Sequence, residues 1–498
     1  MPRIDEVKLF YVIWGLLFVL NFLVLAFSPL TLSVDEAHYW EWSRHPALAY
    51  YSKGPLVAML ITVSKSALGN SAFAVRFPAL LCYTAFSLLF FHFASQLYGS
   101  RRALFLWLVL STMVIFSHMA LLMTTDAPAA LCWLLALVFA YRAIFEERQS
   151  SWLPFGAAVG LGIWAKYTVL ILYPCLGLFF LISPNHRKGF YSGWFAGGAA
   201  ISFLLILPIL LWNASHDWLN FEHNASHVLH GRQFSFTPRH LIELILGQAG
   251  LAGPVVFVSL VIAFWHAMRK RTDDIANFFF AMGAPVFLLM ILVSCTKAVY
   301  ANWPMPLYIG GLLCVMQVMV AESESFKAAH RWYRFSLCVN TLFTLFAYGL
   351  YLGCTYGLPT RLLPTKKLVG WDVLGRKVEE AWQQEGRENT VLVSSYYGFA
   401  SAISFYAPSH PFVYCARLGD RRPNQYSVWT AEADWALLKG KRLLLVLREG
   451  EAIGRVEEKF AHIRALSSTP DVSLEFAGSR TYGFRFYLGE EFDGTPLS

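Results

Sequence analysis

Long apolar runs dominate the first 354 residues of the chain and alternate with short polar segments. Runs such as 9–30 and 190–212 reach about 20 residues, the length that a helix needs to cross roughly 30 Å of hydrocarbon. A buried helix of a soluble domain rarely needs such a length. The pattern therefore predicts a polytopic α-helical membrane protein.

We expect about eleven membrane-spanning helices, because two of the runs read as short helices that meet at a polar turn rather than as one long span. The expected spans are 9–30, 73–97, 103–122, 126–145, 152–165, 168–183, 190–212, 241–267, 276–295, 304–320 and 333–353. The first run is expected to be retained, because the polar segment after it offers no convincing small-residue cleavage site.

After residue 354 the apolar runs shorten to strand length and the charge rises. Strands are expected at 390–394 and 442–447, and helices at 379–384 and 457–466. This pattern predicts a separate soluble α/β domain at 355–498. The membrane domain is then 1–354, with loop 31–72 as its candidate catalytic loop.

Composition and charge agree with this class. Of the 498 residues, 56% are hydrophobic and only 14% are charged, more apolar surface than a soluble core of this size can hide. The net charge of +8 comes mainly from Lys and Arg clusters between apolar runs, such as 101–102 and 269–271. Such clusters orient a membrane protein by marking its cytoplasmic loops, so we expect lipid contacts and no nucleic-acid partner. Loop 31–72 and all residues after 354 are then expected on the opposite face of the membrane.

Two adjacent carboxylates, Asp35 and Glu36, stand among aromatic residues in loop 31–72. A partly desolvated carboxylate at a membrane surface gains basicity and can take a proton from a sugar or lipid hydroxyl. The structural alternative is a helix N-terminus capped by Asp35, with Glu36 in its first turn. We favour catalysis for Asp35 and keep Glu36 beside it as a second candidate.

Asp126 lies between two apolar runs, on the same expected face as Asp35. A carboxylate at the mouth of a helix bundle costs free energy unless it is solvated, paired or used. Capping of the following helix is the alternative, and Pro128 two residues later supports it. Both interpretations stay open for Asp126, which completes the candidate catalytic set.

Lys53, Lys166 and Arg232 are cations expected on that same face. Cations beside carboxylates suit a phosphate leaving group, whose charge must be neutralised as its bond breaks. The alternative is contact with lipid phosphates, which is common for lysines at helix ends. We treat all three as candidate phosphate-binding residues.

Aromatic and histidine side chains supply candidate substrate contacts. Tyr50 and Tyr51 are either interfacial anchors or platforms on which a sugar ring stacks. His227 lies on one helical face with two other histidines of loop 213–240, but no Cys and few carboxylates accompany them. A hydrogen-bonding or phosphate-facing histidine is therefore favoured over a metal ligand.

Six motifs follow one another through the membrane part: DEAHYW (35–40), YYSKGPL (50–56), TDAP (125–128), AKYT (165–168), LWN (211–213) and NWP (302–304). Together they resemble the bacterial branch of the protein mannosyltransferase and lipid A aminoarabinose transferase superfamily, which has the GT-C fold. Over the soluble domain the resemblance rests on NQY (424–426) and Trp429.

Enzymes of that superfamily pass a sugar from a polyprenyl phosphate to an acceptor on the outer face, with inversion at the anomeric carbon. The resemblance implies that Asp35 is the base at the acceptor hydroxyl, with Glu36 beside it, and that Asp126 is the second acidic residue. It assigns Lys53 to the lipid-linked phosphate. Asn302, in the last motif, is a further candidate substrate contact.

No cofactor follows with certainty from the motifs, and a divalent metal stays an open alternative. Ser52 stands where relatives often have Glu before the lysine, so any metal contact by that Glu is not carried over to this chain. No metal ligand is assigned.

The expected function is inverting glycosyl transfer from a polyprenyl-phosphate sugar to lipid A, another glycan or a protein. We expect it at the bacterial inner membrane, with the C-terminal domain on the periplasmic or extracytoplasmic side. One rival is a transporter or lipid flippase with Asp35, Asp126 and Lys166 as a relay. Another is a non-catalytic envelope scaffold.

Overall fold

The computed structural model describes residues 5–228, 237–321, 325–353, 368–418, 423–451, 453–466, 472–476 and 479–497. Contacts divide the chain into two compact units. Unit 1 comprises Met1–Ala26, Lys53–Val57 and Arg76–Ala347, and unit 2 comprises Phe27–Ser52, Ala58–Val75 and Tyr348–Ser498. Most of loop 31–72 therefore groups with the C-terminal part of the chain.

Unit 1 is helical. Its α-helices are α1 (Glu6–Phe27), α4 (Ala72–Tyr98), α5 (Ser100–Ser111), α6 (Val114–Ser117), α7 (Asp126–Phe145), α8 (Trp152–Ala165), α9 (Leu172–Ile182), α10 (Gly193–Ala214), α11 (Leu219–Val228), α12 (Pro238–Ala252), α13 (Pro254–Arg269), α14 (Asp274–Ala281), α15 (Ala284–Ser294), α16 (Pro306–Ala321) and α17 (Ser325–Gly353). Short 3-10 turns are η1 (His118–Ala120), η2 (Gln149–Ser151), η3 (Tyr167–Ile171) and η4 (Pro184–Gly189).

The helices of the described residues include five spans long and apolar enough to cross a membrane, or up to seven if each of two bent pairs is one span. The prediction of a multi-pass helical membrane protein is confirmed, and α7 and α8 begin and end where the sequence placed them. Shorter apolar helices such as Tyr167–Ile182 and Pro306–Ala321 accompany them. The expected total of eleven stays a prediction.

The expected span 241–267 is broken at Gly253. Its φ of 87° lies in the left-handed region that favours glycine, and Pro254 then opens α13. A Cβ at Gly253 would also meet the Asn340 side chain. As a result α12 and α13 meet at 110° instead of forming one rod.

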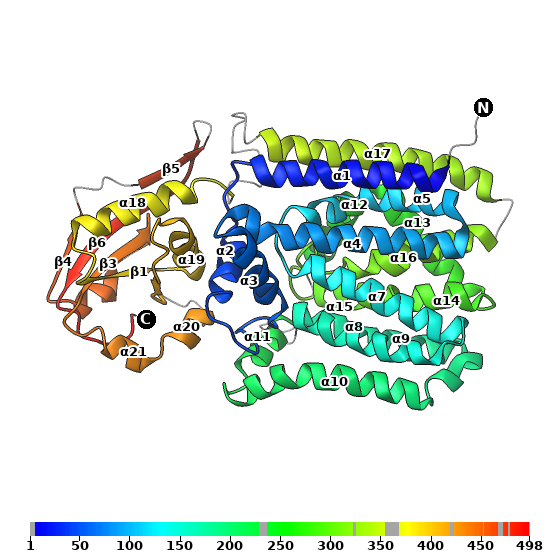
Figure 1. Cartoon of the computed structure of the whole chain (residues 1–498), viewed down its shortest axis with the longest axis horizontal. Helices are drawn as coiled ribbons and strands as arrows, with labels where there is room; N and C mark the ends of the chain where they lie inside the picture. Colours follow the sequence, from blue (N-terminus) through cyan, green and yellow to red (C-terminus); the bar gives the residue numbers. More distant parts are fainter. Residues whose placement is uncertain are drawn as a thin grey trace. The chain divides into compact units, whose positions relative to one another are not determined.

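Small residues let α8 and α10 approach closely. A Cβ on Gly156 would lie 1.9 Å from the carbonyl oxygen of Gly198, and a Cβ on Gly198 would lie 2.1 Å from the carbonyl oxygen of Trp152, so only glycine fits at either position. Ser202 adds a hydrogen bond of 2.7 Å to the Gly156 carbonyl. Figure 1 shows α7, α8 and α10 running alongside one another, and this packing fixes the end of α8, which leads into Lys166.

Unit 2 contains α2 (Val34–Trp42), most of α3 (Leu56–Leu68) and a sheet with its covering helices. The strands are β1 (Thr390–Ser394), β2 (Tyr414–Cys415), β3 (Arg442–Arg448), β4 (His462–Ala465), β5 (Val472–Phe476) and β6 (Ser479–Glu490). The helical segments are α18 (Trp371–Gln384), α19 (Tyr397–Tyr406), α20 (Gln425–Trp429), α21 (Glu432–Ala436) and the 3-10 turn η7 (Gly454–Lys459).

The strand order is β2-β1-β3-β6-β4, with β5 also paired to β6. Strands β1, β2 and β3 are parallel, with Val391 opposite Leu443, whereas β6 runs antiparallel to its neighbours. Buried residues run almost without interruption along β1 and β3, as expected for parallel strands covered on both faces. The predicted α/β fold is confirmed for this region.

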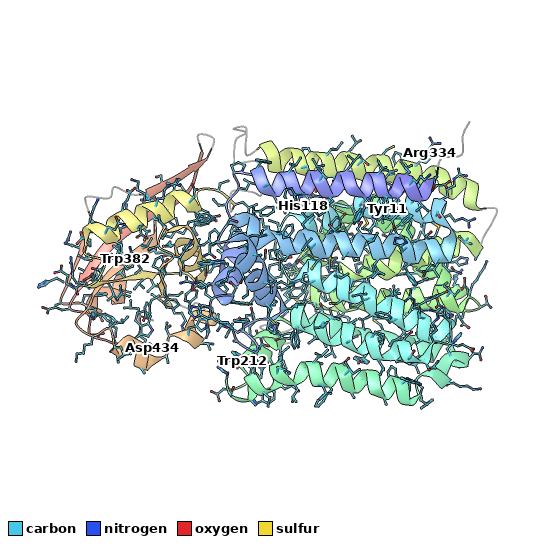
Figure 2. The ribbon with its side chains drawn as sticks, in the orientation of Figure 1. Tyr11, His118, Trp212, Arg334, Trp382 and Asp434 are labelled. Atoms are coloured by element: carbon cyan, nitrogen blue, oxygen red, sulfur yellow. The ribbon has the colours of Figure 1, made fainter. Side chains whose placement is uncertain are left out.

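One face of the sheet packs on α18 and α19. Trp371 opens α18 and lies 5.7 Å from Phe399 and 6.3 Å from Phe484 between ring centroids. Trp382, labelled on α18 in Figure 2, donates from its indole N–H to the Thr390 carbonyl at the start of β1, at 2.6 Å. The helix is thereby fixed to the sheet at both ends.

The helix expected at 457–466 is wrong. Residues 454–459 form the 3-10 turn η7, and β4 follows at His462–Ala465. Strand β4 pairs with β6 from His462 opposite Glu490 to Ala465 opposite Tyr487. The edge of β6 offers this segment backbone partners, and such pairing overrides a local preference for helix.

Candidate active site

Asp126, Lys166 and Asn302 meet in unit 1. The Lys166 Nζ donates to Asp126 Oδ1 at 2.8 Å, and the Asn302 amide donates to Asp126 Oδ2 at 2.7 Å. Asp126 and Lys166 are only 7% and 8% exposed. Because an unpaired charge would be costly there, the two charges stabilise each other.

Local structure places both charges. Asp126 occupies the first position of α7 and Lys166 the C-cap of α8, where the helix dipole favours a negative and a positive charge respectively. The capping interpretation of Asp126 is wrong, because helix α7 begins at Asp126 itself. Its carboxylate bonds to Lys166 and Asn302, and accepts a further hydrogen bond from Thr124 at 3.3 Å.

Lys53 belongs to unit 1 through its main chain. The Lys53 carbonyl accepts a hydrogen bond from the buried amide of Asn220 at 3.4 Å. Gly54 lies so close to α8 that a Cβ there would be 2.4 Å from the carbonyl oxygen of Trp164. Trp164 is two residues before Lys166, so two of the candidate phosphate-binding lysines come from adjoining backbone.

The side chains of two expected site residues fall outside the part of the chain that the structure describes, and a third residue binds Asp126. Arg232 lies outside the described residues, as does the side chain of His227. Asn302 donates its amide to Asp126, and its expected contact with substrate stays a prediction. In the LWN motif, Trp212, labelled in Figure 2, stacks on His216 at 4.0 Å, and the Asn213 side chain accepts from the Phe221 backbone N–H at 3.2 Å.

In unit 2, the start of α2 explains Glu36. Ser33 is the N-cap, and its hydroxyl accepts from the Glu36 backbone N–H at 3.2 Å while Glu36 Oε2 accepts from the Ser33 backbone N–H at 2.9 Å. This reciprocal capping box holds the fully buried Glu36 side chain. The capping that the sequence allowed for this pair of acids thus falls to Ser33 and Glu36.

Asp35 occupies the second position of α2 and is exposed. The Tyr397 hydroxyl donates to its Oδ1 at 3.4 Å, a long hydrogen bond. Burial and the Asp35 charge raise the pKa of Tyr397 well above its ordinary value, so the phenol keeps its proton. The Asp35 side chain can therefore be reached from solvent.

His38, one turn after Asp35, joins α2 to α19. The Trp42 indole N–H donates to His38 Nε2 at 3.1 Å, so the other ring nitrogen carries the proton and donates to Ser401 Oγ at 3.0 Å. Tyr426 contacts the same Ser401 hydroxyl at 2.9 Å. Burial lowers the pKa of His38 to about 3, so the ring stays neutral.

Tyr50 is a core residue rather than an anchor or a sugar platform. Its ring is 1% exposed and stacks on Trp42 at 4.4 Å, and its hydroxyl donates to the Trp42 carbonyl at 3.0 Å. Tyr51 is 9% exposed, and its backbone N–H donates to the Gln425 side chain at 2.6 Å. Gln425 belongs to the NQY motif, so that motif holds the tyrosine pair.

The sequence interpretation missed Glu41 and Tyr397. Glu41 is fully buried and binds Arg44 at 3.1 Å and His45 at 3.2 Å, while Ser404 donates to it at 2.8 Å. The spacing of Glu41 to Arg44 (i,i+3) and to His45 (i,i+4) could have predicted these ion pairs from the sequence. Tyr397 lies 362 residues from Asp35, and nothing local announces that contact.

Within the residues that the structure covers, no group of three or more His, Cys, Asp or Glu side chains could hold a metal ion. Asp35 falls in unit 2, while Asp126, Lys166 and Lys53 fall in unit 1. The roles of all these residues stay predictions.

Comparison with known proteins connects this geometry to a family. Residues 52–212 match the family model of dolichyl-phosphate-mannose-protein mannosyltransferase. The lipid A galacturonosyltransferase RgtD of Rhizobium johnstonii is 27% identical over 338 residues, which cover 66% of this chain and 69% of that protein. Both matches are to glycosyltransferases by name. This confirms the resemblance that the motifs carried.

A second relative is an undecaprenyl phosphate-alpha-4-amino-4-deoxy-L-arabinose arabinosyl transferase of Aeromonas hydrophila. It is 30% identical over 181 residues, which cover 32% of this chain and a third of that protein. The fold matches ArnT from Cupriavidus metallidurans with a TM-score of 0.61 and 14% identity over 97% of each chain. ArnT bound to undecaprenyl phosphate matches with a TM-score of 0.60, 14% identity and 98% coverage of each chain.

Proposed function

We propose that the chain is an inverting glycosyltransferase that moves a sugar from a polyprenyl-phosphate donor to a lipid, glycan or protein acceptor. The reaction takes place on the outer face of the bacterial inner membrane, with the C-terminal domain on the same side. The observation that carries the proposal is the buried Asp126–Lys166–Asn302 cluster beside the backbone of Lys53.

This cluster suits a phosphate leaving group. Two lysines and one carboxylate leave a net positive charge, and Asp126 holds Lys166 and Asn302 in fixed positions before substrate arrives. Fixed charges cost no reorganisation when negative charge develops on the departing phosphate. In this proposal Lys53 and Lys166 meet that phosphate, and Asp126 is a positioning residue.

Asp35 is the base. It takes the proton of the acceptor hydroxyl as that oxygen bonds to the anomeric carbon, while the bond from this carbon to the phosphate oxygen breaks and polyprenyl phosphate leaves with the electron pair. Attack opposite to the leaving group inverts the anomeric centre. Exposure of Asp35 supports this role, whereas the Glu36 side chain already serves the capping box.

The names of relatives support the donor and acceptor classes. The Rhizobium johnstonii relative is named for lipid A and galacturonic acid, and the Aeromonas hydrophila relative for undecaprenyl phosphate and 4-amino-4-deoxy-L-arabinose. The two relatives are therefore named for different sugars. The proposal therefore fixes the lipid-phosphate donor class and leaves the sugar to experiment.

Asp35→Asn tests the assignment in cells that lack the native protein. Mass spectrometry of membrane glycolipids and envelope glycans first identifies the sugar that disappears without the chain. We expect Asp35→Asn to lower its transfer by about 100-fold or more, the scale of a lost general base. Asp372→Asn, which alters an exposed surface ion pair, should transfer at the wild-type rate.

Glu36→Gln is the matched control within α2, because Gln can still accept the Ser33 hydrogen bond. We expect it to keep most of the transfer. Wild-type transfer by Asp35→Asn at equal membrane abundance would exclude Asp35 as the base and would favour the transporter or scaffold alternatives.

A further inference from the structure

Unit 2 contains a cavity of about 460 Å³ at the carboxyl ends of the parallel strands β1, β2 and β3. Ser395 follows β1, Ala416 follows β2, and Arg448 ends β3. In the order β2-β1-β3, the connection after β1 leads to β2 on one side of β1, and the connection after β2 crosses to β3 on the other side of β1. Sheets bind ligands at such switch points, and this volume suits a small molecule.

Aromatic side chains form part of the cavity wall. Tyr396 and Tyr397 lie 4.4 Å apart between centroids at the start of α19, and Tyr482 of β6 contributes a third ring. All three are partly exposed. The C–H faces of a pyranose ring pack well on such rings, whose hydroxyl groups can also bond to sugar oxygens.

Positive charge lines the same cavity. Arg417 and Arg448 are both exposed, and the Arg448 guanidinium lies over the Tyr482 ring at 5.4 Å. The Glu451 carboxylate accepts from the Ser395 hydroxyl and from the Arg448 backbone N–H, at 3.1 Å for the latter. Arginine forks suit phosphate or carboxylate groups.

The cavity adjoins the candidate base. Val34 contributes to its wall and immediately precedes Asp35. Tyr397, also in the wall, donates its hydroxyl to Asp35 at 3.4 Å. A ligand that moves the Tyr397 ring therefore acts directly on the hydrogen bond to Asp35.

We propose that this cavity holds the acceptor and that the acceptor is an anionic saccharide. A phosphate or carboxylate on the sugar binds Arg417 and Arg448, the pyranose ring packs on Tyr482 and Tyr396, and Tyr397 connects the bound sugar to Asp35. The assignment of the ligand as acceptor rests on the proposed function.

Saturation-transfer difference NMR on the full-length protein in nanodiscs tests the cavity. Glucose 1-phosphate is the probe. Glucose, which lacks the phosphate, and inorganic phosphate, which lacks the sugar, are the control ligands. We expect ring-proton signals from glucose 1-phosphate, at least tenfold weaker binding of glucose, and competition by inorganic phosphate only at much higher concentration.

Variants locate the binding. Arg448→Gln and Tyr482→Ala should each weaken glucose 1-phosphate binding by tenfold or more, whereas Arg376→Gln, an exposed arginine on α18, should leave it unchanged. Equal binding by all variants, or none by the wild type, overturns the proposal. Nanodiscs that contain lipid A should displace the probe, and a failure to do so overturns the assignment of a membrane glycolipid acceptor.

Asp35→Asn separates this proposal from the proposed function. It should lose transfer but retain glucose 1-phosphate binding, because Asp35 does not line the cavity. Lost binding in Arg448→Gln with undiminished transfer would exclude the cavity as the acceptor site while leaving Asp35 as the base. Undiminished transfer by Asp35→Asn would exclude the base while leaving the cavity.

Discussion

Asp126 and Lys166 depend on each other because neither has enough water around it to keep a charge alone. Asp126→Ala or Lys166→Ala should each lower the free energy of unfolding by about 3–5 kcal/mol, since each leaves an uncompensated buried charge. The double variant should lose less than the sum, by about 1 kcal/mol or more. Unfolding with increasing denaturing detergent measures all three, and strictly additive losses would contradict the coupling.

His38 makes the stability of unit 2 depend on pH. Its pKa is about 3 in the folded protein and about 6.5 when exposed, so below pH 6.5 the unfolded chain takes up a proton that the folded chain refuses. Stability should therefore fall by about 1.4 kcal/mol per unit as pH decreases from 6.5 towards 3. The tyrosine, tryptophan and serine groups around the ring do not titrate in that window.

Thermal melts followed by tryptophan fluorescence at pH 4 to 7.5 measure this slope. His38→Gln should be less stable at pH 7 but should show a shallower decline towards acid. His462→Gln, which changes an exposed histidine on β4, should keep the wild-type slope. Parallel slopes for His38→Gln and the wild type would show that His38 is not the group responsible.

At the scale of elements, the contact between Gly54 and the end of α8 keeps Lys53 in place. Gly54→Ala would set a methyl group 2.4 Å from the Trp164 carbonyl oxygen, so the segment must move away from α8. We expect about tenfold or more loss of transfer, because small displacements of a positioned group are costly. Gly177→Ala on α9 meets no atom within 4 Å and should transfer normally; equal activity of both variants would refute the argument.

Elements defined by local pattern could be read from the sequence, and those defined by distant partners could not. Helices α7 and α8 match their predicted ranges because long apolar runs with clear polar ends leave one choice. The break at Gly253 depends on a backbone angle, and β4 depends on the edge of β6. The Gly253–Pro254 pair is a local turn signal that the sequence interpretation passed over, whereas no residue near β4 indicates its partner strand.

The candidate site divides in the same way. Its charged residues were recognisable from their unusual place among apolar runs, but their partners were not. Asn302 reaches Asp126 across 176 residues, and Tyr397 reaches Asp35 across 362. A spacing rule covers only a few residues, so it could name Asp35, Asp126 and Lys166 as candidates but could not show which side chains bond to which.

For the whole molecule, the grouping of α2 with the C-terminal domain predicts how fragments behave. Residues 368–498 made alone would expose the face of α19 that contacts α2, including the partners of His38 and Trp40. We expect this fragment to be unstable and prone to aggregate, and a fusion of residues 28–52 to its N-terminus to raise its melting temperature. Equal melting temperatures for the fragment and the fusion would contradict the shared core.

The long sequence separation between α2 and its partners also delays the completion of this core during synthesis. His38 leaves the ribosome 363 residues before Ser401, a delay of roughly 20 to 70 seconds at ordinary rates of synthesis. During that interval α2 lacks the hydrogen bonds and aromatic neighbours that complete its core. The nascent chain thus carries Asp35 without these partners until the last fifth of the protein is made, and a chain that terminates earlier never acquires them.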